Sequence, residues 1–244
     1  MMKILLTNDD GYNSEGIQIL HEALKPYGEV LLVAPHHHMS GASASRVFWN
    51  KVKVHKHEEN VYSIEGTPAD AVSLALHGLN YRPDVVFSGI NNGLNVGADT
   101  VYSGTVGACM EALKAKMPAV ALSADFDHFK QAKKDLKKVL DFIIDNKLIT
   151  NKYMLNINFV SRNFKKSKGI LVTDLGFRPT QHYYIEEGDH YTTKRRFSDF
   201  QFEPETDLHA VNNGYISITP LKFANQTEYG LKELRKKVSN IVQE

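Results

Sequence analysis

The chain has 244 residues, and its 29 Lys and Arg against 28 Asp and Glu give a formal net charge of +1 with a mean hydropathy of −0.33. This balance is typical of a globular protein and excludes a strongly basic nucleic-acid coat protein or a strongly acidic tail. We expect a cytoplasmic protein that binds neither membranes nor nucleic-acid polymers, because no apolar stretch could cross a bilayer, the N-terminal apolar run is too short for a secretory signal, and the single cysteine, Cys109, excludes an internal disulfide.

The first 34 residues predict a strand, a helix and a second strand. Residues 3–7 are apolar without a solvent-facing side, as in a parallel sheet, and the turn composition of residues 8–11 ends them. A helix is expected from Ser14, its N-cap, to Lys25, followed by a buried strand over 30–34. Such a unit crosses over right-handed into a parallel sheet.

A polar loop over 35–46 and a β-hairpin come next. Apolar and polar residues alternate within 52–64, which is typical of strands at a sheet edge. Thr67 then has the position and type of an N-cap residue, and the helix that it starts is expected to run to His77.

Strands and helices continue to alternate up to about residue 160. The expected elements are a strand over 84–88, a loop over 89–103, a helix over 104–116, a strand over 119–123, a helix over 129–146 and a strand over 153–159. The loop is rich in glycine and asparagine, and so long a segment without secondary structure is rare in a compact domain unless it has a function.

After residue 160 the composition shifts toward Tyr, Thr, Arg and Glu. Alternation over 169–173 and 183–202 predicts further strands and a protruding β-hairpin arm, and residues 232–242 predict a closing helix. We therefore expect an α/β fold with a mostly parallel sheet, in which residues 1–160 form the core and 161–244 complete it without forming an independent domain.

Four polar clusters follow the predicted strands, and ligands of open parallel sheets bind beyond the carboxyl ends of the strands. The clusters are Asn8-Asp9-Asp10-Gly11, the loop from His36 to Ser43, Ser88-Gly89-Ile90-Asn91-Asn92-Gly93, and Ser123-Ala124-Asp125. Because these strand ends meet at one edge of the sheet, we expect the clusters to converge on one site.

Asp9 and Asp10 are adjacent carboxylates at the end of the first strand. Two negative charges in a concave site repel each other unless a cation neutralises them, and hard oxygen ligands favour Mg²⁺, Mn²⁺ or Ca²⁺. Ser40 and Asn91 offer neutral oxygens that would complete such a site. The alternative is that Asp9 and Asp10 only form a turn and cap the next helix, but the neighbouring clusters favour the metal.

Ser103, Gly104 and Thr105 open a helix whose first N–H groups lack partners within the helix, and such a terminus suits a phosphate. The alternatives are that Ser103 is an ordinary N-cap and that the preceding loop is a long turn without a ligand. Next to a divalent cation, the phosphate interpretation is favoured. The loop has neither the spacing of a dinucleotide fingerprint nor that of a P-loop.

His36, His37 and His38 do not predict a zinc site, because adjacent histidines cannot easily converge on one ion. We expect these rings to line the rim of the site, with a solvated loop as the alternative. Cys109 is expected in the core.

Five sequence blocks between residues 3 and 125 resemble, in order, those of the SurE family of stationary-phase survival proteins, which are metal-dependent nucleoside monophosphate phosphatases. The blocks are Asn8-Asp9-Asp10-Gly11, Ala34-Pro35 with Ser40-Gly41-Ala42-Ser43, Gly66-Thr67-Pro68-Ala69-Asp70, Ser88-Gly89-Ile90-Asn91 with Gly93 and Asn95, and Tyr102-Ser103-Gly104-Thr105-Val106.

The resemblance implies a Rossmann-like three-layer α/β/α core whose C-terminal hairpin arm and helix build a homodimer or homotetramer. It implies one divalent cation per subunit, Mg²⁺ or Mn²⁺ before others. The implied site residues are the catalytic and metal-binding Asp9 and Asp10, the further metal ligands Ser40 and Asn91, and the phosphate-binding Asn95, Ser103, Gly104 and Thr105. Residues 36–39 depart from the family, which usually has an acidic residue and a basic residue or Gln there, and this departure concerns substrate preference.

We therefore expect hydrolysis of nucleoside 5′-monophosphates, and also of 3′-monophosphates, to nucleoside and phosphate. The alternatives are a broader acid phosphatase or exopolyphosphatase on the same site, a hydrolase with a phosphoaspartyl intermediate, and a non-catalytic nucleotide-binding regulator. Phosphoaspartyl sites usually separate their two aspartates by one residue, whereas Asp9 and Asp10 are adjacent.

Overall fold

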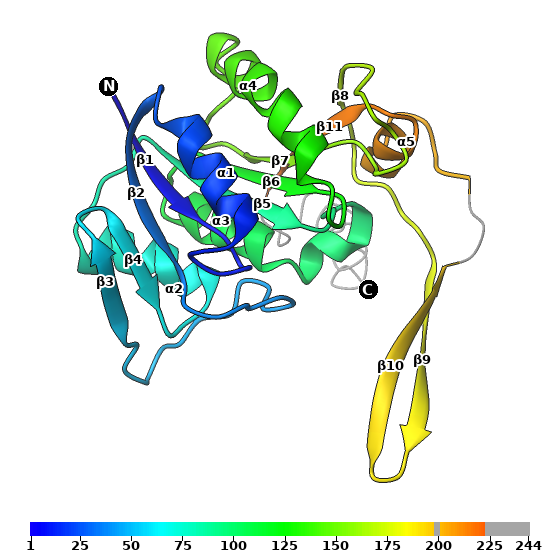
Figure 1. Cartoon of the computed structure of the whole chain (residues 1–244), viewed down its shortest axis with the longest axis horizontal. Coiled ribbons are helices and arrows are strands. Elements are labelled where there is room, and N and C mark those ends of the chain that lie inside the picture. Colours follow the sequence, from blue (N-terminus) through cyan, green and yellow to red (C-terminus); the bar gives the residue numbers. More distant parts are fainter. Residues whose placement is uncertain (198–200, 223–244) are drawn as a thin grey trace, which may run out of the picture.

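A computed structural model describes residues 1–197 and 201–222 of the chain. Within these residues, nine strands form one sheet in the order β3-β4-β2-β1-β5-β6-β7-β11-β8 (Figure 1). Their bounds are β1 Met2–Thr7, β2 Gly28–Pro35, β3 Val54–Glu58, β4 Val61–Ile64, β5 Val85–Asn92, β6 Ala119–Ala124, β7 Met154–Asn158, β8 Ile170–Val172 and β11 Ile216–Leu221.

The six neighbouring strands β4, β2, β1, β5, β6 and β7 run parallel to one another. β3 pairs antiparallel with β4 at one edge, as the predicted hairpin requires. β11 lies between β7 and β8 and pairs antiparallel with β7 and parallel with β8. The mostly parallel sheet of the predicted α/β fold is therefore confirmed.

Helices cover both faces of the sheet. Their bounds are α1 Glu15–Leu24, α2 Pro68–Ser73 with a π-helical turn over Leu74–Gly78, the 3-10 helix η2 Gly97–Val101, α3 Gly104–Lys114, α4 Phe129–Asp145 and α5 Asp207–Asn212. Leu20 of α1 and Leu136 of α4 pack on one face with Leu6 of β1. Leu5 faces the other side, where α2 and α3 bring Ala71 and Ala108. The alternation of side chains along β1 thus fills both layers.

Cys109 lies in the second of these layers, fully buried as predicted. Burial raises the pKa of its thiol, which opposes a role as a nucleophile.

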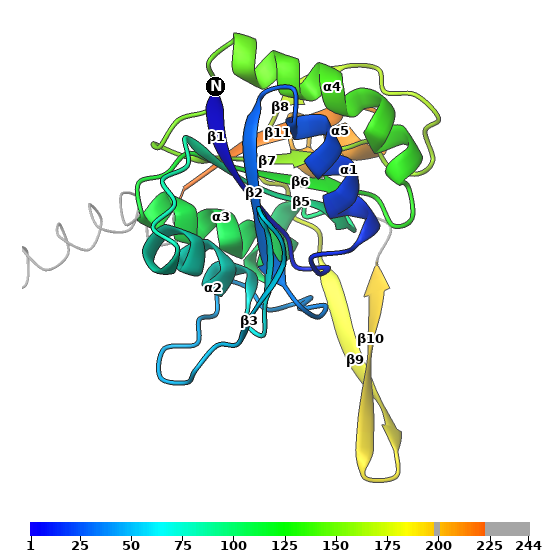
Figure 2. The same cartoon turned by 60° about the vertical axis from the view of Figure 1, so that its left-hand side comes forward.

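The predicted hairpin is formed by β9 Thr180–Glu187 and β10 His190–Phe197, which pair antiparallel with each other. Figure 2 shows it projecting away from the three layers. Its role in oligomerisation stays a prediction, as does the division of the chain at residue 160.

The predicted loop over 89–103 was wrong in extent. β5 continues to Asn92 and η2 occupies Gly97–Val101, so only short connections remain irregular. α5 and β11 were not predicted as individual elements, and the predicted helix over 232–242 lies outside the described residues. No helix in the described part of the chain is long and apolar enough to cross a membrane.

Candidate active site

The carboxyl ends of β1, β2, β5 and β6 lie at one edge of the sheet, where the predicted polar clusters meet. Asn8 folds the turn after β1, because its amide nitrogen donates to Gly11 O (2.9 Å) and to Ser14 Oγ (2.8 Å). Ser14 is the N-cap residue of α1 as predicted, but its hydroxyl accepts from Asn8 and not from a helix N–H. This turn leaves Asp9 and Asp10 at the tip of β1.

Asp9 is a buried carboxylate that faces the first turn of α3. It is 3% exposed, and its Oδ1 accepts a 2.5 Å hydrogen bond from Thr105 Oγ1. Gly104 permits this approach, because a β-carbon there would lie 2.9 Å from Asp9 Cβ and 3.0 Å from Asp9 Oδ2. Burial raises the pKa of Asp9; the Thr105 hydroxyl opposes that rise and the charge of Asp10 adds to it.

Asp10 is less buried and contacts two further loops. Its Oδ2 accepts from the backbone N–H of Asn92 (2.9 Å), and its Oδ1 lies 3.2 Å from Nδ1 of His38. The His38 side chain is 62% exposed. Neither contact could be predicted, because each depends on how the loops after β2 and β5 fold back over the strand ends.

The three adjacent histidines separate in the structure. His38 contacts Asp10, whereas Nδ1 of His36 lies 2.9 Å from Ser63 Oγ on β4, and His37 packs edge-on against His36. The three rings thus contact different groups, and their place at the rim of the site stays a prediction.

A β-bulge positions Asn91. The register of β5 against β6 shifts between Ser88 and Asn91, next to Gly89, which has φ +136° and whose β-carbon would overlap Leu122 O. The Asn91 amide nitrogen donates to Gly93 O (2.7 Å). This hydrogen bond fixes the amide and leaves its oxygen available to a cation.

Ser40 lies on the loop after β2, which is attached at both ends to the site. The Met39 N–H donates to Asp9 O (2.7 Å), and the Ser43 N–H donates to Tyr102 O (3.0 Å) just before α3. Ser40 is exposed between these two attachments. Ser40 therefore follows directly the residue that is bonded to the Asp9 backbone, and its role as a ligand stays a prediction.

The first turn of α3 offers hydrogen-bond donors beside Asp9. Ser103 Oγ accepts from Val106 N (3.1 Å), so Ser103 is the N-cap that the alternative interpretation described. Gly104 and Thr105 follow at the positive end of the helix dipole, buried against Asp9. A capping role and a phosphate-binding role are compatible here, because the cap uses Ser103 as an acceptor and a phosphate would use its hydroxyl proton.

Asn95 belongs to a buried polar network. Its amide nitrogen donates to Ser123 Oγ (2.9 Å) and its N–H to Asn158 Oδ1 (2.8 Å), while its carbonyl accepts from the amides of Asn156 (2.8 Å) and Asn158 (3.0 Å). Asn156 and Asn158 were missed, although two asparagines within a buried strand are a signal that their amides have partners.

Asp207 was also missed. It is fully buried and accepts three backbone hydrogen bonds, from the N–H groups of Gly97 (2.8 Å), Gly176 (2.8 Å) and Leu208 (2.7 Å). Burial raises its pKa, and these N–H groups oppose the rise. The bond to Gly97 holds the segment between β5 and α3 in place. The preceding Thr206 caps α5, and Thr-Asp is a helix start that the sequence displays.

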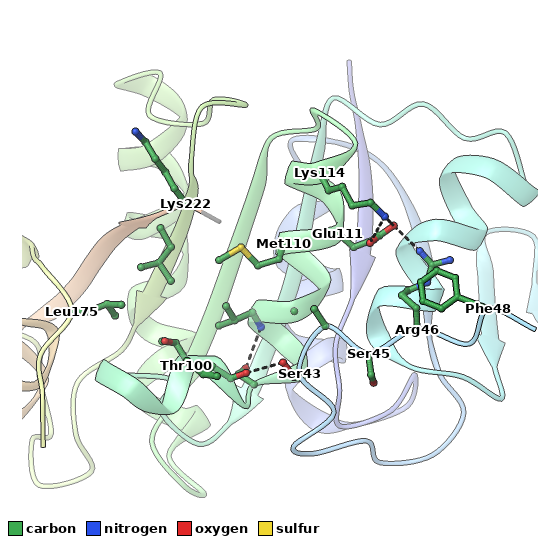
Figure 3. Close-up of a pocket in the computed structure, with 16 residues that line it drawn as sticks. Ser43, Ser45, Arg46, Phe48, Thr100, Met110, Glu111, Lys114, Leu175 and Lys222 are labelled. Atoms are coloured by element: carbon green, nitrogen blue, oxygen red, sulfur yellow. Dashed lines mark hydrogen bonds and ion pairs between the residues drawn. The ribbon is translucent and has the colours of Figure 1, made fainter. Parts of the chain in front are cut away.

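A separate cavity of about 660 Å³ opens along another face of α3. Figure 3 shows Met110 pointing from the helix into it, with Arg46, Glu111 and Lys114 joined on one side and Lys222 on the other. Arg46 Nη1 lies 2.6 Å from Glu111 Oε1, and Lys114 Nζ lies 3.3 Å from Glu111 Oε2. Asp9 and Asp10 do not line this cavity, whereas Ser103 at the start of α3 does.

The side-chain oxygens proposed as ligands at this site are of the kind that a hard divalent cation prefers. Two carboxylates, the Asn91 amide oxygen and the Ser40 hydroxyl are all oxygen ligands of the kind that Mg²⁺ and Mn²⁺ prefer. The pKa of Asp9 is raised by burial and by its neighbour Asp10, and a bound cation would favour its ionised form.

Comparison with known proteins identifies close relatives. A family model described as "Survival protein SurE" matches residues 4–182. The 5′-nucleotidase SurE of Actinobacillus succinogenes is 38% identical in an alignment that covers 96% of this chain and 98% of the relative. That of Vibrio cholerae serotype O1 is 38% identical in an alignment that covers 91% of each chain. The crystal structure of the SurE protein from Aquifex aeolicus superimposes with a TM-score of 0.82 at 35% identity, covering 96% of this chain and 99% of that one.

Proposed function

This chain belongs to the SurE family, and from that membership and the site geometry we infer that it is a 5′-nucleotidase, which hydrolyses nucleoside 5′-monophosphates to nucleoside and phosphate. The observation that carries the inference is the contact between Asp9 and the first turn of α3, through Thr105 Oγ1 and Gly104. A carboxylate pair and a helix N-terminus then lie side by side, as a phosphate held together with a cation requires.

The reaction is proposed to depend on one divalent cation per subunit, Mg²⁺ or Mn²⁺ before others. Asp9, Asp10, Ser40 and Asn91 would hold it. When bound, such an ion polarises a phosphate oxygen and lowers the pKa of water. Nucleoside 3′-monophosphates are proposed as further substrates, because nothing in this arrangement of phosphate-binding groups requires a 5′ ester.

The protein's own groups have distinct roles in this proposal. The N–H groups of Gly104 and Thr105 and the hydroxyl of Ser103 bind the phosphate oxygens on which negative charge accumulates, while the Thr105 hydroxyl stays on Asp9. Asn95, whose amide nitrogen donates to Ser123 Oγ, is proposed as a further phosphate-binding residue from the segment before η2. A carboxylate oxygen of the catalytic pair, Asp9 or Asp10, accepts the proton of the attacking water.

A phosphate-release assay tests the proposal. The protein is treated with EDTA, supplied with Mg²⁺, Mn²⁺, Ca²⁺, Co²⁺ or Zn²⁺ in turn, and given AMP, 3′-AMP and short polyphosphate. We expect release from AMP that requires the cation, and its loss in Asp9→Asn and Asp10→Asn. Asp84→Asn is the matched control. Asp84 lies just before β5, at the amino ends of the strands and so away from the candidate site, where its carboxylate accepts from Lys3 N.

Three outcomes would contradict the proposal. Nucleotide binding without cation-stimulated turnover would indicate a regulator, and faster release from polyphosphate than from AMP would indicate an exopolyphosphatase. Full activity of Asp10→Asn would remove the carboxylate pair from the mechanism. The predicted homodimer or homotetramer is tested separately, by light scattering of the purified chain, where a monomer would contradict it.

A further inference from the structure

Four aromatic rings lie in nearly parallel planes near the β3–β4 edge of the sheet. The ring centroids of Tyr12 and His57 are 4.1 Å apart with planes 10° apart, and those of His36 and His55 are 4.7 Å and 28° apart. His36 links the two pairs, at 5.6 Å from Tyr12 and 6.3 Å from His57, with planes 14° and 12° apart. We call Tyr12, His36, His55 and His57 the histidine array.

Hydrogen bonds fix the orientation of these rings. The buried Ser63 Oγ lies 2.9 Å from His36 Nδ1 and 2.8 Å from His57 Nε2. Its single proton can serve only one of these nitrogens, so the other imidazole donates to the hydroxyl oxygen. His55 Nε2 lies 3.1 Å from Glu65 Oε1. The array is therefore a preformed stack whose rings do not need to be ordered by a ligand.

The array does not have the geometry of a metal site. His36 and His57 each place one ring nitrogen on the Ser63 hydroxyl, and His55 places one on the Glu65 carboxylate, so these nitrogens already have hydrogen-bond partners. Among the described residues, no group of three His, Cys, Asp or Glu could hold a metal ion. Burial and the neighbouring imidazoles of His37 and His55 lower the pKa of His36, which favours a neutral, stacking ring.

Two chain segments connect the array to the candidate active site. Tyr12 follows Asp10 by two residues, and its N–H donates to Pro35 O at the end of β2 (3.0 Å). His36 lies two residues before His38, and Nδ1 of His38 lies 3.2 Å from Asp10 Oδ1. Tyr12 and His36 therefore lie two residues along the chain from Asp10 and from its partner His38, and His57 is exposed to solvent. A phosphate held between Asp10 and α3 would leave the rest of its molecule free to turn toward these rings.

We propose that the histidine array binds the base of the nucleotide by stacking, and so selects nucleoside monophosphates over sugar phosphates. This inference rests on the proposed function, whose site it extends. Imidazole and phenol rings stack on planar bases, and the ring nitrogens and the Tyr12 hydroxyl offer hydrogen bonds to a base edge. A purine overlaps more of the array than a pyrimidine does, so purine nucleotides are the preferred class.

A pair of substrates that differ only in the base tests this role. AMP and ribose 5-phosphate carry the same phosphate and sugar, so the ratio of their kcat/KM values isolates the contribution of the base. His57→Leu removes a stacking ring from an exposed position on the edge strand β3, and His57→Phe keeps a ring there. His77→Leu is the control, because it makes the same change at an exposed histidine in the π-helical turn after α2.

We expect the ratio to fall about tenfold in His57→Leu, which equals about 1.4 kcal/mol and lies within the range for stacking of a base. His57→Phe should restore most of the ratio, and His77→Leu should equal the wild type. An unchanged ratio in His57→Leu, or an equal fall in His57→Phe, would overturn a stacking role.

A binding experiment in EDTA decides the inference independently of turnover. Adenosine and ribose are titrated into the whole chain while the ring C–H protons of the histidines are followed by NMR. Adenosine, but not ribose, should shift the signals of His36, His55 and His57. Equal shifts with both, or shifts with Zn²⁺ and none with adenosine, would refute base binding. If the wild type released phosphate from neither substrate, the proposed function would fail while this titration still reported on the array.

Discussion

Replacing Thr105 by Val tests the contact on which the site geometry depends. The change removes one hydroxyl and almost preserves the shape of the side chain. Thr105 is fully buried and Asp9 is 3% exposed, so water cannot replace the lost 2.5 Å hydrogen bond to the carboxylate. A hydrogen bond to a charged group contributes about 1.5–3 kcal/mol. For a chain of this size that loss corresponds to a fall in Tm of roughly 3–12 °C.

The measurement is thermal and urea unfolding of the EDTA-treated protein, with Thr105→Ser as the matched variant because it keeps the hydroxyl. Thr105→Val should lose the stated stability and at least tenfold in phosphate release, whereas Thr105→Ser should lose a small part of each. If Thr105→Val unfolded at the wild-type midpoint, or if Thr105→Ser were equally destabilised, the hydrogen bond would not be what holds α3 against Asp9.

Three further predictions address the loop anchor, pH and metal. Arg46→Met leaves the buried Asp70 and Glu111 carboxylates without their shared partner, so we expect a loss of about 3 kcal/mol in urea unfolding, against less than about 1 kcal/mol for the exposed Lys53→Met. Burial lowers the pKa of His21 below 6.5, so protonation of His21 opposes folding, and the wild type should lose stability as pH falls from about 6.5. His21→Gln should show a shallower pH dependence of stability, and an identical dependence would mean that His21 is not responsible for it. Mn²⁺ at 100 times its Kd should stabilise by about 2.7 kcal/mol, or roughly 5–10 °C in Tm, and Asp10→Asn should abolish most of that shift.

The parts of the fold that were predictable are those determined by contacts close in sequence. Thr67 caps α2 in a capping box with Asp70, three residues away, and both the hydroxyl and the carboxylate accept backbone N–H groups. The turn at Asn8 to Gly11 closes within four residues for the same reason. The convergence of the polar clusters followed from the parallel direction of the strands that precede them.

The parts that were not predictable depend on partners far along the chain. The extension of β5 through Asn91 exists because β6 pairs with it across a bulge, and the sequence of β5 alone reads as a glycine-rich loop. β11, which was not predicted, depends on pairing with β7, about 60 residues earlier in the chain, and with β8. The histidine array requires the register that sets His55 opposite Ser63, which no local pattern specifies.

Contacts between residues far apart in the chain also keep this site rigid, although most of its groups lie on loops. The segment between β5 and α3 is held by Asp207 at Gly97 and by Asn158 at Asn95, and the loop after β2 is held by Met39 at Asp9. Each anchor is a buried or backbone group from a different element. Because an unpaired buried acceptor would cost about 1–3 kcal/mol, these loops have few alternative conformations. A phosphate and a cation would therefore meet donors and carboxylates already in place, and the binding energy would not be lost in ordering them.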